Sequence, residues 1–142
     1  MLYFGIVQFY QRPDAHGTMV KIISLIKRYW FGITLFILAA ITFLSLWPLP
    51  ELPEVPGTDK THHFIAYGFL MFPAALRKPE KWLLFALFFI AYSGVIELIQ
   101  PMVNRYGEWL DFGANVSGIV CGMAAAEAVG RWGRKRKGCM SS

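Results

Sequence analysis

The chain has 142 residues, of which 56% are hydrophobic, 16% aromatic and only 16% charged. Soluble domains usually carry about a quarter charged residues, so this composition argues against a single water-exposed globular domain. The net charge of +5 does not indicate nucleic-acid binding, because the basic residues flank apolar runs instead of forming one basic surface. The sequence predicts an all-α fold, a polytopic transmembrane four-helix bundle whose spans are about 20 residues long.

Residues 1–28 are expected to form an N-terminal cytoplasmic or interfacial segment. Its opening mixes aromatic and polar residues, is too short to cross a bilayer and lacks the basic start of a signal peptide. The sequence leaves open whether this segment lies at the membrane interface or precedes a true translation start at Met19.

The first clear span is predicted over Tyr29–Trp47, with an uncharged core and aromatic residues at both ends, where they anchor helices at the membrane interface. Pro48 and Pro50 end it. The linker that follows, as far as Lys60, is Pro-rich and acidic, which predicts an extended connection.

The second apolar run, Phe64–Leu76, has only thirteen residues. At 1.5 Å per residue it reaches about 20 Å, short of a hydrocarbon core of about 30 Å. It crosses only if Asp59–His63 belong to the helix, or if the bilayer thins. We therefore expect this polar stretch to be drawn towards the membrane.

The third span is predicted over Trp82–Ile99 and the fourth over about Asp111–Val129. With the first two spans they define a transmembrane domain over residues 29–130. A basic cytoplasmic tail is expected over residues 131–142.

The distribution of basic residues predicts the orientation. Twelve of the fourteen Lys and Arg residues lie before the first span, between the second and third, or after the fourth; the exceptions are Lys60 and Arg105. Because Lys and Arg stay on the cytoplasmic side, both termini are expected inside and the two acidic loops outside.

This topology predicts that polar groups from several spans meet near the outer surface. Asp59, His63 and Tyr67 recur at i, i+4 and i+8, close to one helix face. The candidate functional residues are Asp59, Lys60, His63, Tyr67, Glu97, Gln100, Arg105, Asp111 and Asn115.

Structural explanations exist for several of these residues. Asp59 and Asp111 could each cap the helix that follows, for about 1 kcal/mol. Tyr67 could serve only packing in an aromatic-rich bundle. Arg105 could pair with Glu108 in a loop, which contributes little to stability.

Glu97 is the residue least easily explained by structure alone. It lies about one turn inside an apolar run, where a carboxylate needs a partner or must be held neutral. Lys60, His63 and Arg105 are the available partners. A neutral Glu97 could instead donate or accept a proton.

The fourth span carries a ladder of small residues, spaced so that another helix can approach closely. They are Ala114, Gly118, Gly122, Ala126 and Gly130. We expect helix packing along this ladder, and an oligomer through the Gly118 and Gly122 face is the alternative.

Three sequence elements, DKTHHFIAYGFL, IELIQP and NRYGEWLDFGANVSG, together resemble the VanZ-like membrane proteins. The family pattern is roughly Asp-Lys-x-x-His-Phe-x-x-Tyr, then Glu-x-x-Gln, then Arg followed by Asp-x-x-x-Asn-x-x-Gly. The matches occur in this order between Asp59 and Gly122, nearly half of the chain. The family is named for a protein associated with resistance to teicoplanin, an acyl-tailed glycopeptide antibiotic. The resemblance implies a role in the bacterial cell envelope and a location in the bacterial cytoplasmic (inner) membrane.

Three functions fit these observations. The outer pocket could bind the polar head of an amphiphilic envelope molecule, with Lys60 and Arg105 holding an anionic group. Alternatively, the chain is a membrane-embedded hydrolase or transferase that acts through His63, Glu97 and Asp111. In the third, the cluster only locks the helices together. No reaction-specific motif occurs, so no catalytic residue is assigned, and neither a metal nor a cofactor is expected.

Overall fold

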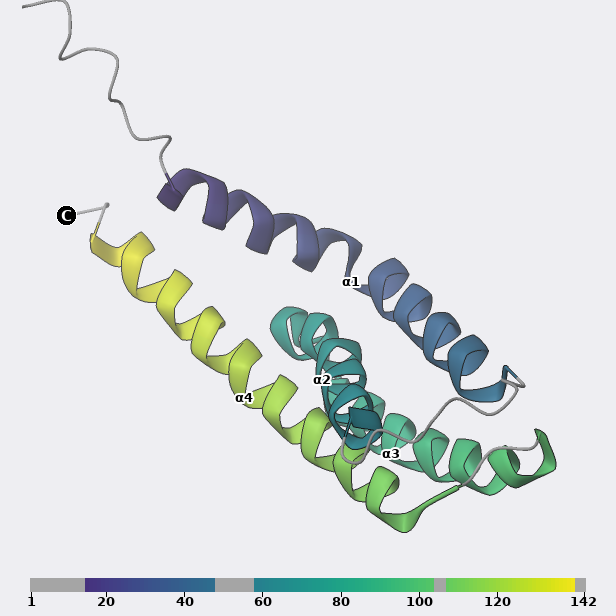
Figure 1. Ribbon diagram of the computed structural model, residues 1–142. Helices are drawn as coiled ribbons and strands as arrows, with labels where there is room; N and C mark the ends of the chain where they lie inside the picture. The colour runs from purple at the N-terminus through teal and green to yellow at the C-terminus, as the bar shows by residue number, and fades with distance from the viewer. Residues whose placement is uncertain (1–14, 48–57, 104–106, 140–142) are drawn as a thin grey trace, which may run out of the picture.

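The computed structural model describes residues 15–47, 58–103 and 107–139 (Figure 1). Within these ranges the structure is all-helical and has no strand. Its elements are α1 (Ala15–Leu46), α2 (Thr58–Arg77), α3 (Trp82–Ile99), the 3-10 helix η2 (Gln100–Val103) and α4 (Trp109–Cys139). The prediction of an all-α fold with four long helices is confirmed for this part of the chain.

Helices α1 and α3 run in the same direction. The rings of Trp30 and Phe85 meet edge to face with their centroids 5.4 Å apart. Further along both helices, the hydroxyls of Thr42 and Tyr92 are hydrogen bonded. These two contacts fix the register of α1 against α3.

Helices α2 and α4 also run parallel to each other and make the most intimate contact in the fold. A Cβ placed on Gly118 would lie 2.2 Å from the carbonyl oxygen of Phe64, and one on Gly122 would lie 2.4 Å from that of Gly68. Only glycine permits backbones to approach so closely. The Gly118 and Gly122 face is thus occupied by α2 within the chain.

Helix α2 occupies the middle of the fold, between α1 and α4 (Figure 1). Its side chains Leu70, Met71 and Ala74 are fully buried. The helix begins at Thr58, so the polar stretch before Phe64 does belong to it. Its 20 residues give a length of about 30 Å.

In the described part of the chain, three helices are long and apolar enough to cross a membrane: Gly17–Leu46, Trp82–Val103 and Trp109–Arg134. Their large side chains cover the outside of the chain; Phe36 is 74% exposed and Leu98 66%. Apolar residues outside and polar residues inside are suited to a lipid environment, so the chain is a membrane protein.

Two helices extend beyond the membrane spans predicted for them. Helix α1 starts at Ala15, well before Tyr29, and Tyr29 itself is a kink with φ −104° and ψ 16°. Helix α4 continues past Val129 to Cys139. Lys and Arg are good helix formers, so basic residues that mark the edge of an apolar span do not end the helix.

Candidate functional site

Asn115, in the second turn of α4, is fully buried and joins three helices. Its Nδ2 donates hydrogen bonds to Ser93 Oγ at 3.1 Å and to Glu97 Oε1 at 3.2 Å, both on α3. Its Oδ1 lies 3.1 Å from Nδ1 of His63 on α2. Because Oδ1 can only accept, this geometry assigns a proton to His63 Nδ1.

The Glu97 carboxylate and the His63 imidazole are neighbours in this cluster. Glu97 Oε1 lies 4.0 Å from His63 Nδ1, and the two residues are only 8% and 9% exposed. The carboxylate of Asp111 is close enough to repel that of Glu97. The structure thus brings two carboxylates and an imidazole from three helices together.

Glu97 Oε2 is buried and has no hydrogen-bond partner among the described residues. The backbone N–H of Glu108 faces this carboxylate but does not complete a hydrogen bond to Oε2. Buried oxygens are rarely left without a donor, so this one is suited to a water molecule or a polar ligand group.

Lys60 links the buried cluster to the surface. Its Nζ donates a hydrogen bond to Glu108 Oε2 at 2.9 Å and lies 3.9 Å from Asp111 Oδ1. The side chains of Lys60 and Glu108 are 40% and 50% exposed, whereas that of Asp111 is 4% exposed. Exposure therefore falls steeply from the rim of the site to its centre.

Tyr67 lies one helical turn below His63 and is 1% exposed. Its hydroxyl faces Ser93, but no hydrogen bond of normal geometry reaches it from the described residues. The polar cluster thus extends inward as far as Tyr67, where it borders the apolar core.

Gln100 contacts α1, whereas the candidate residues described above form the polar cluster. It is 2% exposed, and its Nε2 donates to the carbonyl oxygen of Ser45 at 3.4 Å. Ser45 lies in the last turn of α1, where backbone carbonyls have no partner within their own helix. Gln100 therefore caps the C-terminus of α1.

The remaining candidate residues are only partly described. Asp59 lies at the start of α2, but its side chain is outside the described part of the structure, as is the whole of Arg105. Helix α4 begins at Trp109, which puts Asp111 in its first turn and not at the N-cap position. The alternative role of Arg105, pairing with Glu108, is not tested, because Arg105 lies outside the described residues.

Two residues of the cluster were absent from the predicted set. Ser93 accepts from Asn115, and Glu108 binds Lys60. The position of Ser93 four residues before Glu97, on the same helix face, was a usable signal. Glu108 carried no comparable signal, since its partner lies on another helix.

The described residues include no group of three or more His, Cys, Asp and Glu side chains arranged to hold a metal ion. Their arrangement instead provides hydrogen-bond acceptors, one imidazole and one rim ammonium group. Comparison with protein-family models, curated protein sequences and solved structures found no match. The chemistry of the site is therefore inferred from its own side chains.

Proposed function

We propose that the chain is a VanZ-like integral membrane protein whose outer-leaflet polar pocket binds the head of an amphiphilic envelope lipid or lipoglycopeptide-type molecule. The observation that carries the proposal is the joining of His63, Glu97 and Asn115 into one buried hydrogen-bonded cluster. Polar groups at membrane depth are costly, and they usually mark a site of function.

The charges of the site favour a particular kind of head group. Among its described residues, Glu97, Glu108 and Asp111 supply three carboxylates, against the one ammonium group of Lys60. A site rich in acceptors binds a head that donates hydrogen bonds, such as an amine, an amide or sugar hydroxyls. An anionic head would have to displace the carboxylates that already contact Lys60.

The orientation belongs to the same proposal. Both termini lie on the cytoplasmic side of a bacterial inner membrane, because nearly all Lys and Arg residues flank that side. Helix α2 forms a fourth crossing in the middle of the bundle, with Leu70, Met71 and Ala74 buried against its neighbours and Phe69 exposed to lipid. The site around Asn115 then opens at the outer leaflet.

Photo-crosslinking tests the binding function. An acyl-tailed probe with an amino-sugar head and a matched probe with a phosphate head are irradiated with membranes that contain the protein, and labelled peptides are mapped. The proposal requires labels from the amino-sugar probe around Lys60, Met102 and Trp109. Labels scattered along the exposed faces of α1, with none in these segments, would contradict it.

A membrane-embedded hydrolase or transferase is the second candidate. The observation that favours it is the 4.0 Å separation of His63 Nδ1 and Glu97 Oε1, which brings an imidazole and a carboxylate within reach of one substrate. Here, purified protein must turn over an envelope lipid, and His63→Ala must abolish turnover. If the protein binds the probe tightly but turns over no lipid, the enzyme hypothesis is excluded and the binding function is supported.

A further inference from the structure

A second charged cluster lies at the other end of the α2–α4 pair. Glu127 of α4 forms an ion pair with Lys78, the residue that follows α2. Glu127 Oε1 also lies 2.8 Å from Arg131 Nε and 3.5 Å from Arg134 Nη2. Three cations thus share one carboxylate, which leaves this cluster with a net charge of +2.

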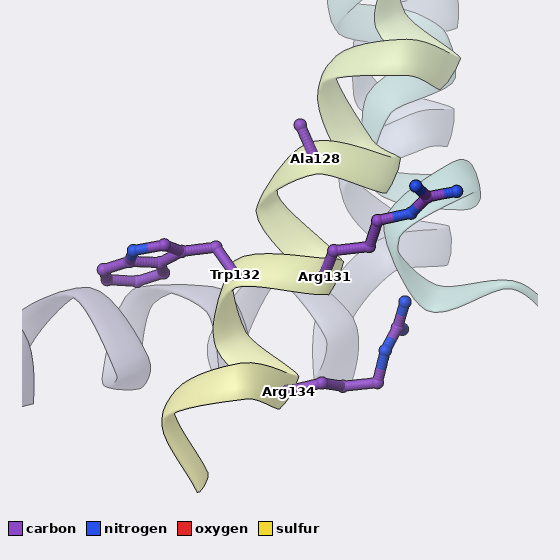
Figure 2. Close-up of a pocket in the computed structure, with 4 residues that line it drawn as sticks. All are labelled: Ala128, Arg131, Trp132 and Arg134. Carbon is purple, nitrogen blue, oxygen red and sulfur yellow. The ribbon is translucent and has the colours of Figure 1, made fainter. Parts of the chain in front are cut away.

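The cluster borders a surface depression of about 500 Å³. Its lining residues are Ala128, Arg131, Trp132 and Arg134. In Figure 2, Arg131 and Arg134 extend from one side of the helix and Trp132 from the other, with the small Ala128 above them. The arginine side chains are 71% and 65% exposed, so their guanidinium groups can still reach a ligand.

The position of the depression matches the opposite membrane surface. Arg134 lies 23 positions after Asp111 in α4, about 35 Å along the helix axis. This is close to the hydrocarbon thickness of about 30 Å. Trp132 has the side chain that is enriched at the membrane interface. Further basic residues, Lys135, Arg136 and Lys137, follow immediately in the sequence.

We propose that this depression is a binding site for the phosphate head group of an anionic glycerophospholipid. Arg131 and Arg134 present paired N–H donors that match phosphate oxygens. Basic pockets beside transmembrane helices bind such heads, because the surface potential of an anionic leaflet adds to the local contacts. Exposed small side chains at Ala124 and Ala125 leave room for an acyl chain along α4. The site does not depend on the ligand proposed for the outer cluster.

Native mass spectrometry of the purified full chain measures the affinity of this site. The protein is titrated with phosphatidylglycerol, with phosphatidylcholine of the same acyl chains, and with inorganic phosphate. We expect phosphatidylglycerol to bind at least tenfold more tightly than phosphatidylcholine, and inorganic phosphate to compete only weakly. Arg131→Gln/Arg134→Gln should weaken phosphatidylglycerol binding roughly 30-fold, because two charge-assisted contacts to the phosphate are lost.

Two matched controls separate a site from general charge attraction. Arg77→Gln/Lys81→Gln removes the same charge from exposed positions at the same end of the bundle and should keep the affinity within about threefold. Ala128→Phe fills the depression without changing charge and should weaken binding about tenfold, whereas Val120→Phe, at an exposed position outside the lining, should not. Thermal unfolding confirms that each variant is folded. If the Arg131→Gln/Arg134→Gln variant does not fold, the single variant Arg134→Gln is measured in its place.

Three results would overturn the proposal. One is equal loss of affinity in the Arg131/Arg134 and Arg77/Lys81 variants, which would mean non-specific attraction. Another is full affinity in Ala128→Phe. The third is binding of inorganic phosphate as strong as that of phosphatidylglycerol, which would make the ligand a free anion and not a lipid.

Discussion

Asn115 Nδ2 donates to Glu97 Oε1 at 3.2 Å, and this hydrogen bond ties the start of α4 to the end of α3 inside the bundle. The same amide contacts His63 on α2. One side chain thus holds together three helices at this end of the bundle. The stability of the fold and the geometry of the proposed site therefore depend on the same residue.

Asn115→Ala should lower the free energy of unfolding by roughly 2–4 kcal/mol, because it removes the buried hydrogen bonds of Asn115 to Ser93, Glu97 and His63. Thermal or denaturant unfolding in detergent measures the change. Ser117→Ala is the matched control, since Ser117 is exposed and, among the described residues, its hydroxyl donates to the carbonyl of Gly113 in its own helix. Equal stability of the two variants would show that the Asn115 bonds contribute nothing.

Gly122→Ala should destabilise the bundle by about 1–3 kcal/mol, because the added Cβ would lie 2.4 Å from the carbonyl oxygen of Gly68 and force α2 away from α4. Gly113→Ala, on the same helix, meets nothing within 4 Å. It should leave stability unchanged or raise it by up to about 1 kcal/mol through helix propensity. The difference in melting temperature between the two variants checks this prediction.

The helices themselves were predictable because each is determined by the residues of its own segment. Three long apolar runs and one shorter run, Phe64–Leu76, indicate four helices in this sequence without knowledge of their neighbours. The start of α1 was missed because Lys21, Lys27 and Arg28 interrupt the apolar pattern, although they do not disfavour helix. The hydropathy of a sequence predicts which part of a helix lies in the membrane, but it does not predict where the helix begins or ends.

The detailed contacts of the site were less predictable because they join residues far apart in the sequence. Spacing brought His63, Glu97 and Asn115 to one level, but the hydrogen bonds between them depend on how the helices rotate as they pack. Gln100 illustrates the difference. Its position resembles that of a site residue, yet its bond to Ser45 O exists only because α1 ends beside α3.

Glu97→Gln should fold normally, because the amide oxygen can still accept from Asn115, while ligand affinity falls roughly tenfold or more with the loss of the charge. The proposed envelope function predicts that a strain that lacks the gene is more sensitive to cell-envelope antibiotics, and that this variant fails to restore its resistance. Protein levels in the membrane serve as the control for folding. Full restoration by Glu97→Gln would indicate that the cluster has only a structural role.

Cysteine labelling tests the proposed orientation. In a chain with Cys121→Ser and Cys139→Ser, a cysteine at Met102, which is 82% exposed in η2, should react in intact cells with a membrane-impermeant maleimide. A cysteine at Lys81, exposed between α2 and α3, should react only after permeabilisation. The reverse pattern would place the termini outside and the Asn115 cluster at the inner leaflet.

The central claim is that the buried cluster of His63, Glu97 and Asn115 recognises a ligand head at the outer surface. The most direct measurement is the labelling yield of the acyl-tailed amino-sugar photo-probe, at a probe concentration well below the wild-type dissociation constant and at equal amounts of folded protein. The account predicts that Glu97→Gln retains less than about a tenth of the wild-type yield, while Ser117→Ala retains all of it. Equal yields from wild type, Glu97→Gln and Ser117→Ala would contradict it.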